Sequence, residues 1–98
     1  MSNKKSENKE QAKNFAVAFT DQAWEDYLYW QQQDVKILEE INSLLDECQR
    51  DPFRGTGKPE PLKHNLTGYW SRRITKEHRL VYLPADNGIY VVSCRFHY

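Results

Sequence analysis

Residues 69–96 read YWSRRITKEHRLVYLPADNGIYVVSCRF and contain three short segments rich in aromatic and β-branched side chains. These segments cover residues 69–74, 79–83 and 89–96, and the polar spacers TKEH and PADNG between them have the length of hairpin loops. Aromatic and β-branched side chains pack well on a pleated surface. The stretch therefore predicts three consecutive antiparallel strands.

Two helical patterns precede these strands. The first follows Thr20 and the second follows Asp34, and both residue types cap helix N-termini. Asp51-Pro52 ends the second pattern, and the glutamines at 31–33 form a short junction, so we expect a helical hairpin. The apolar positions at helical spacing are Ala23, Tyr27 and Trp30 in the first pattern, and Ile37 or Leu38, Ile41, Leu44 or Leu45, and Cys48 in the second.

Before the helices, an apolar run over residues 15–19 predicts a further strand. Between the helices and the three C-terminal strands, the glycines and prolines of residues 52–68 predict a loop. The predicted order is β-α-α-β-β-β. This is an α+β domain in which the helical hairpin packs on one face of an antiparallel sheet and leaves the other face open. Residues 1–14 have almost no apolar side chains, so we expect a disordered polar extension followed by one domain over residues 15–98.

Composition indicates a small intracellular domain. The chain has 98 residues, and its three Trp, six Tyr and four Phe offset the thin core of so short a chain. Cys48 and Cys94 show no CxxC spacing, so we expect two reduced core thiols, and Trp24, Trp30 and Trp70 are interpreted as packing residues. No segment resembles a signal peptide or a membrane span, which predicts a cytoplasmic protein without a membrane partner.

The net charge of zero hides a division along the chain. Residues 15–49 carry one basic and eight acidic side chains, whereas residues 50–98 carry nine basic and four acidic ones. Such asymmetry is expected when one half of a domain meets a polyanion. Two solvated faces would produce the same pattern, and charge alone does not separate these alternatives.

Several motifs are excluded as sites. Gly55-Thr56-Gly57-Lys58 is followed by Pro59, so it lacks the Ser or Thr and the helix of a phosphate-binding loop. His64, His78 and His97 do not have metal-ligand spacing, and the acids of the basic half are isolated from one another. We therefore expect neither a metal nor another cofactor.

The remaining polar residues include the types needed to cleave RNA without a metal. This chemistry requires a base for the 2′-OH proton, a cation for the charged phosphorane and an acid for the departing 5′-oxygen. Most small domains contain a Glu, an Arg and a His, so these residue types alone favour a binding module over a nuclease. The candidates are Glu60, Lys63, Arg72, Arg73, Arg79 and the terminal His97.

Residues 57–82, GKPEPLKHNLTGYWSRRITKEHRLVY, resemble the most characteristic stretch of the YoeB/Txe toxins in the RelE/ParE superfamily. The resemblance extends to residues 24–30, 51–53 and 94–98, and covers residues 15–98 in all. It implies a RelE-like fold and a ribosome-dependent mRNA endoribonuclease, an mRNA interferase, that cuts mRNA in the A site of the 30S/70S ribosome. A type II toxin of this kind is neutralised by a YefM-type antitoxin, and the family also suggests a homodimer.

The resemblance also implies a role for individual residues, while His64 and His78 match the family but are interpreted as structural. The catalytic residues would be Glu60 as general base, Arg79 as the cation that stabilises the transition state, His97 as general acid and Tyr98 as the ring that orients the nucleotide; Lys63, Arg72 and Arg73 would bind RNA.

The alternative is a non-enzymatic toxin on the same scaffold, similar to the ParE toxins that act by binding DNA gyrase. ParE-like chains lack the loop with Glu60 and the His97-Tyr98 ending, and both are present here. The sequence therefore favours the nuclease.

Overall fold

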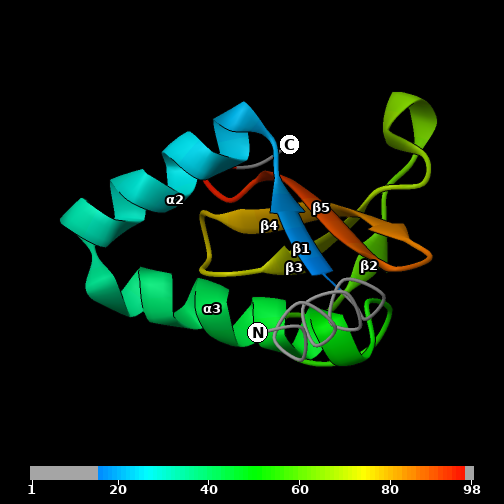
Figure 1. The fold of residues 1–98 in the computed structure, drawn as a ribbon, viewed down its shortest axis with the longest axis horizontal. Helices are drawn as coiled ribbons and strands as arrows, with labels where there is room; N and C mark the ends of the chain where they lie inside the picture. The colour runs from blue at the N-terminus through cyan, green and yellow to red at the C-terminus, as the bar shows by residue number, and fades with distance from the viewer. Residues whose placement is uncertain (1–15, 97–98) are drawn as a thin grey trace, which may run out of the picture.

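The computed structural model describes residues 16–96, which form two helices and a five-stranded sheet (Figure 1). The expected element order is confirmed, with one additional strand of two residues, β2. The predicted extension over residues 1–14 lies outside the described residues. The elements are β1 (Ala16–Phe19), α2 (Asp21–Gln33), α3 (Val35–Arg50), β2 (Glu60–Pro61), a 3₁₀ turn (His64–Leu66), β3 (Trp70–Arg73), β4 (Arg79–Ala85) and β5 (Gly88–Ser93).

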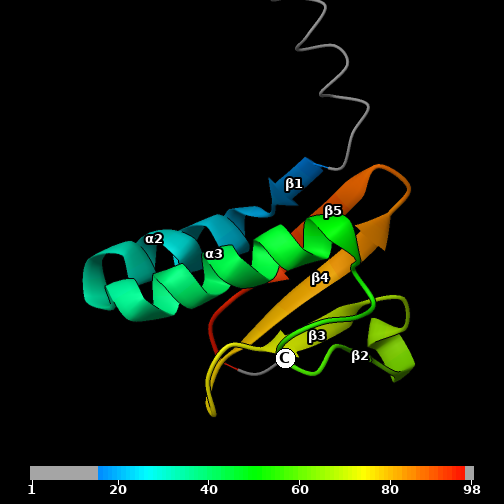
Figure 2. The same cartoon turned by 90° about the horizontal axis from the view of Figure 1, so that it is seen from below.

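The strands lie in the order β1-β5-β4-β3-β2, and the helical hairpin covers one face of the sheet, as Figure 2 shows. Four neighbouring strands are antiparallel, but β1 is parallel to β5, so the sheet is mixed rather than wholly antiparallel. Parallel neighbours need a long connection. The two helices and the strands β2, β3 and β4 form this connection between β1 and β5.

One aspartate forms the corner of the helical hairpin. Asp34 ends α2, and its carboxylate accepts hydrogen bonds from the main-chain N–H groups of Lys36 and Ile37 at 3.1 and 3.3 Å, which caps α3. Thr20 caps α2 in the same way, as its residue type predicts. The glutamines expected at the junction belong to the last turn of α2. Neither helix is long and apolar enough to cross a membrane, as judged over residues 16–96.

The core lies between the helices and the sheet. Both cysteines are buried and free, as expected, and burial raises the pKa of the Cys94 thiol to about 12. Trp24 is 48% exposed but still packs between helix and sheet, because its ring stacks on Tyr27 and meets the ring of Phe19 in β1 edge-on. The buried cluster contains Ala23, Trp30, Ile41, Leu44, Leu45, Cys48, Ile74, Leu80, Tyr82, Ile89, Val91 and Cys94.

A close approach of two strands holds β1 in place. Gly88 is opposite Ala16 in the β1–β5 pairing, and a Cβ atom on Gly88 would collide with the main-chain carbonyl of Ala16. Only a residue without a side chain allows this pairing.

We therefore predict that Gly88→Ala displaces β1 and lowers the free energy of unfolding by about 1–3 kcal/mol, the usual range for overpacking. Urea denaturation followed by circular dichroism measures the loss. Asn87→Ala, an exposed change in the adjacent turn, should stay within about 0.5 kcal/mol of wild type. A Gly88→Ala protein as stable as wild type would contradict the close approach.

Candidate functional site

Polar side chains gather on the sheet face that the helices leave open. In the antiparallel pairings, Glu60 is opposite Ser71, and Arg73 is opposite Arg79. Residues opposite each other point to the same side of a sheet. Since Leu80, the next residue of β4, belongs to the core, these four side chains point away from the helices.

Arg79 is held between a serine and a carboxylate. Its Nη1 atom donates to Ser71 Oγ at 3.2 Å and forms an ion pair with Glu60 Oε1 at 3.3 Å. The side chain of Arg79 is 17% exposed, whereas that of Glu60 is 50% exposed. The site therefore combines a fixed cation with a carboxylate that bulk solvent and a ligand can reach.

Glu60 also lines a pocket of about 400 Å³ formed by residues 60–66. The buried side chain of Leu62 anchors this segment, and its main-chain N–H donates to the carbonyl of Tyr69 at 2.9 Å. His64 adopts a left-handed φ of 59°, and its carbonyl accepts a hydrogen bond from the Thr67 hydroxyl at 2.6 Å. The exposed Lys63 thus lies in a shaped concave surface beside Glu60.

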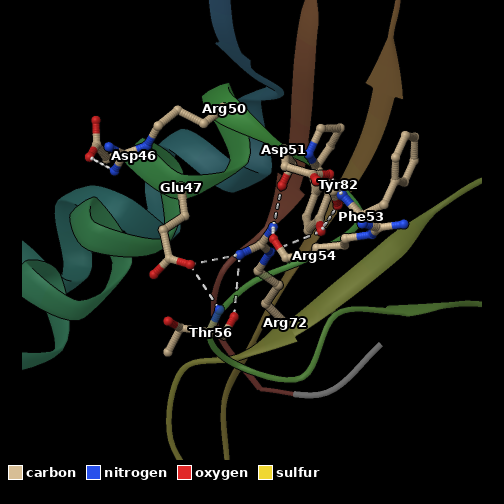
Figure 3. A network of polar contacts seen from close by, with 10 residues as sticks. Asp46, Glu47, Arg50, Asp51, Phe53, Arg54, Thr56, Arg72 and Tyr82 are labelled. Atoms are coloured by element: carbon tan, nitrogen blue, oxygen red, sulfur yellow. Dashed lines mark hydrogen bonds and ion pairs between the residues drawn. The ribbon is translucent and has the colours of Figure 1, made fainter.

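The loop between α3 and β2 is built around the guanidinium of Arg72 (Figure 3). Arg72 is fully buried, and every polar atom of its side chain is engaged by protein. Its contacts are the carbonyls of Asp51 (2.6 Å), Arg54 (2.8 Å) and Thr56 (3.3 Å), the Tyr82 hydroxyl (3.1 Å) and Glu47 Oε1 (3.5 Å).

This burial revises the expectation that Arg72 binds RNA. Adjacent residues in a strand point to opposite faces, so only one of Arg72 and Arg73 can share a face with Arg79. The structure gives that position to Arg73, which is exposed, and turns Arg72 into the interior. Strand alternation was the sequence signal that could have separated the two arginines.

The loop network also perturbs two titratable groups. The main-chain N–H of Thr56 donates to Glu47 Oε1 at 2.8 Å, and this hydrogen bond, assisted by the charges of Arg72 and Arg50, lowers the pKa of Glu47 below its ordinary value of 4.5. Burial raises the pKa of Tyr82 above its usual range. Both groups therefore hold one protonation state at neutral pH, Glu47 as an anion and Tyr82 as a neutral hydroxyl.

Glu47→Gln should destabilise the protein at neutral pH by about 1–2 kcal/mol, because it weakens a charged hydrogen bond that holds the loop. The pKa of Glu47 is lower in the folded state, so its contribution is complete above about pH 4.5 and is lost as the pH falls through the folded pKa. Urea denaturation between about pH 7 and about pH 3 should show the difference from wild type shrinking. Glu39→Gln, at an exposed position of the same helix, controls for the lost charge. A difference that grew on acidification would refute the assignment.

The structure brings together four of the predicted site residues. Glu60 and Arg79 are in contact, Arg73 is the cross-strand neighbour of Arg79, and Lys63 shares the pocket with Glu60. His97 and Tyr98 lie outside the described residues. Within residues 16–96, no group of three His, Cys, Asp or Glu side chains has the proximity needed to hold a metal ion.

Sequence reasoning missed Asp26, which is 95% buried in α2. Its carboxylate accepts hydrogen bonds from the main-chain N–H of Cys94 at 3.1 Å and from Gln22 at 3.0 Å. The signal was present as an acid one residue before Tyr27 on the apolar side of the first helical pattern. Asp26 fixes the segment that follows β5 and leads to the end of the chain.

Comparison with known proteins agrees with this architecture. Residues 19–98 match the family model of the YoeB-like toxins of bacterial type II toxin-antitoxin systems. The toxin YoeB of Synechocystis is 61% identical over 84% of this chain and 95% of its own length. Two solved structures from Staphylococcus aureus, the YoeB dimer and the heterotetrameric YoeB–YefM complex, are each 52% identical over 87% of this chain and 99% of theirs, with TM-scores of 0.81 and 0.80.

Proposed function

The chain belongs to the family of YoeB-like toxins of bacterial type II toxin-antitoxin systems, and on that premise we propose that it is a cytoplasmic endoribonuclease that cleaves mRNA in the ribosomal A site. The observation that carries this proposal is the contact between Arg79 and the half-exposed Glu60 at 3.3 Å. A carboxylate can take a proton, and a guanidinium beside it can stabilise a phosphorane.

The proposed reaction is a metal-free transesterification in which the 2′-oxygen displaces the 5′-oxygen at phosphorus. Glu60 removes the proton of the 2′-OH, and the 2′-oxygen forms a bond to phosphorus. The bond from phosphorus to the 5′-oxygen breaks, and His97 donates a proton to that oxygen. The products are a 2′,3′-cyclic phosphate and a 5′-hydroxyl, while Arg79 stabilises the negative charge of the phosphorane.

Two further cations extend the site along the backbone of the RNA. Arg73 lies beside Arg79 on β3, and Lys63 lies on the pocket wall beside Glu60. We assign phosphate binding to both, and this agrees with the basic excess of residues 50–98. The structural role of Arg72 removes it from this set.

The end of the chain is tied to the same corner of the sheet. The carbonyl of Phe96 accepts a hydrogen bond from the main-chain N–H of Arg79 at 3.1 Å. This contact supports the assignment of His97 as the general acid and of Tyr98 as the ring that orients the nucleotide, because both follow directly on Phe96 in the sequence.

We further propose that a YefM-type antitoxin holds the protein inactive and that the toxin forms a homodimer. The support comes from the Staphylococcus aureus relatives, which have been solved as a YoeB dimer and as a heterotetrameric YoeB–YefM complex. Each of these structures aligns with 87% of this chain, so this protein has the same fold around the surfaces that its relatives could use for such contacts.

Arg79→Ala should reduce cleavage of ribosome-bound mRNA by about 10²–10³-fold, since the lost cation acts on charge that develops in the transition state. Purified ribosomes, a defined mRNA and primer extension measure the rate. Arg50→Ala is a matched control, because Arg50 is an exposed arginine on α3 that forms an ion pair with the exposed Asp46. Cleavage by folded Arg79→Ala at the wild-type rate would refute the role of Arg79.

Removal of residues 97–98 should lower the rate of cleavage by at least about 10²–10⁴-fold and leave a small residual rate, while the antitoxin complex keeps its affinity. The deletion takes away both the proposed acid and the orienting ring, and general acid catalysis alone contributes about 10²–10⁴-fold. The assays are primer extension and titration with a purified YefM-type antitoxin. The opposite truncation, which removes residues 1–14, should change neither property. A chain ending at Phe96 that still cut mRNA at full rate would defeat the nuclease assignment as stated.

A further inference from the structure

The first two residues after β5, Cys94 and Arg95, are held by side chains of α2. Main-chain groups of Cys94 bond to two α2 side chains: its N–H donates to Asp26 at 3.1 Å, and its carbonyl accepts from Trp30 Nε1 at 2.8 Å. Beyond it, the guanidinium of Arg95 lies 3.6 Å from the ring centroid of Tyr29. Three residues of α2 therefore direct the chain past the end of the strand.

Phe96 is attached at both of its main-chain polar groups. Its N–H donates to Nδ1 of His78 at 2.7 Å, and its carbonyl accepts from the N–H of Arg79 at 3.1 Å. Phe96 has a φ of 62°, a left-handed conformation that is strained for a bulky residue, and its side chain is 55% exposed. Burial of the ring therefore does not account for the strained conformation. The two main-chain hydrogen bonds hold Phe96 in it.

The hydrogen bond defines the chemical form of His78. Its Nδ1 atom accepts a proton from a main-chain N–H, so this nitrogen must carry a lone pair. The imidazole is therefore neutral with its proton on Nε2. A protonated ring would place two donors face to face and break the contact with Phe96.

Neighbouring rings hold His78 in the orientation that this bond needs. The Trp30 ring meets it edge-on, with centroids 4.7 Å apart and an interplanar angle of 76°. On the other side, the Phe96 ring lies 5.3 Å away at 46°. Trp30 is itself fixed by its bond to Cys94, so α2 and the C-terminal segment both contact the imidazole of His78.

We propose that His78 is a positioning residue for catalysis: through its neutral Nδ1 it fixes Phe96 beside Arg79, and so presents the end of the chain to the Glu60–Arg79 pair. This inference rests on the proposed ribonuclease activity and adds a role to a residue that the sequence marked as structural. His78 does not touch the substrate. It acts on the reaction through the placement of the general acid.

Two substitutions separate this role from simple packing. His78→Asn keeps a hydrogen-bond acceptor at the place of Nδ1 but loses the ring, whereas His78→Phe keeps a ring against Trp30 but loses the acceptor. A displacement of about 1 Å in a reacting group costs about 10²-fold in rate. On ribosome-bound mRNA, His78→Phe should lower kcat about 10²-fold with KM little changed, and His78→Asn should recover most of the wild-type kcat. If His78→Phe were fully active and His78→Asn were not, the residue would serve packing only.

A second background tests whether His78 acts through the end of the chain. In a protein that lacks residues 97–98, the groups that His78 is proposed to place are gone, so His78→Phe should leave the residual rate unchanged within about twofold. The same loss of about 10²-fold in both backgrounds would overturn the proposal.

Nitrogen-15 NMR of the full wild-type chain tests the contact without any need for activity. The proposal requires a proton on Nε2 and none on Nδ1 of His78, together with slow hydrogen exchange of the Phe96 amide that is lost in His78→Phe. A proton on Nδ1 would overturn it. If wild type cut no mRNA, the proposed function would fail; if wild type and His78→Phe cut equally fast, only the role of His78 would fail.

Discussion

The strict alternation of side chains along β3 is the constraint on which the loop and the candidate site both depend. Trp70 and Arg72 face the helices, and Ser71 and Arg73 face the open side of the sheet. A shift of register by one residue would expose the buried guanidinium and bury the cation beside Arg79. The register of β3 therefore determines both which arginine organises the loop and which cation lies beside Arg79.

The buried side chain of Arg72 anchors the loop between α3 and β2, a role that a hydrophobic residue would have in a larger domain. A loop of nine residues between α3 and β2 has little apolar surface of its own, so its carbonyl groups converge on the guanidinium of Arg72. A buried charge is tolerated only when hydrogen bonds satisfy it. Here they do so for every polar atom of the side chain, and Glu47 supplies a compensating negative charge. The ordered loop in turn leads into β2, where Glu60 begins.

Local patterns predicted most of the fold. The caps at Thr20 and Asp34, the apolar stripe of α3 and the composition of the three C-terminal strands each depend on a few neighbouring residues, and all agree with the structure. The parallel pairing of β1 with β5 could not be read in this way, because it joins residues about seventy positions apart. The strand β2 is too short to show any periodicity.

In the candidate site, too, the sequence predicted some residues, but it did not predict the roles that depend on contacts between distant residues. The resemblance of residues 57–82 to a toxin family identified Glu60, Lys63, Arg73 and Arg79, which the sheet brings to one face or one pocket. Motif matching treated Arg72 like its neighbour, although burial decides the difference. It also missed the contribution of Asp26 and His78, whose partners Cys94 and Phe96 lie far along the chain. Roles that depend on long-range hydrogen bonds became visible only in three dimensions.

In the proposed mechanism, the 2′-oxygen of the RNA, activated by Glu60, attacks the phosphorus atom. The most direct measurement uses ribosome-bound mRNA in which the nucleotide on the 5′ side of the cleaved bond carries a 2′-deoxyribose, compared with the all-ribose message. This mechanism predicts that the all-ribose message yields a 2′,3′-cyclic phosphate and a 5′-hydroxyl, and that the deoxy-substituted message is not cut at that position. Cleavage of the substituted message at the same bond and at a similar rate would contradict it.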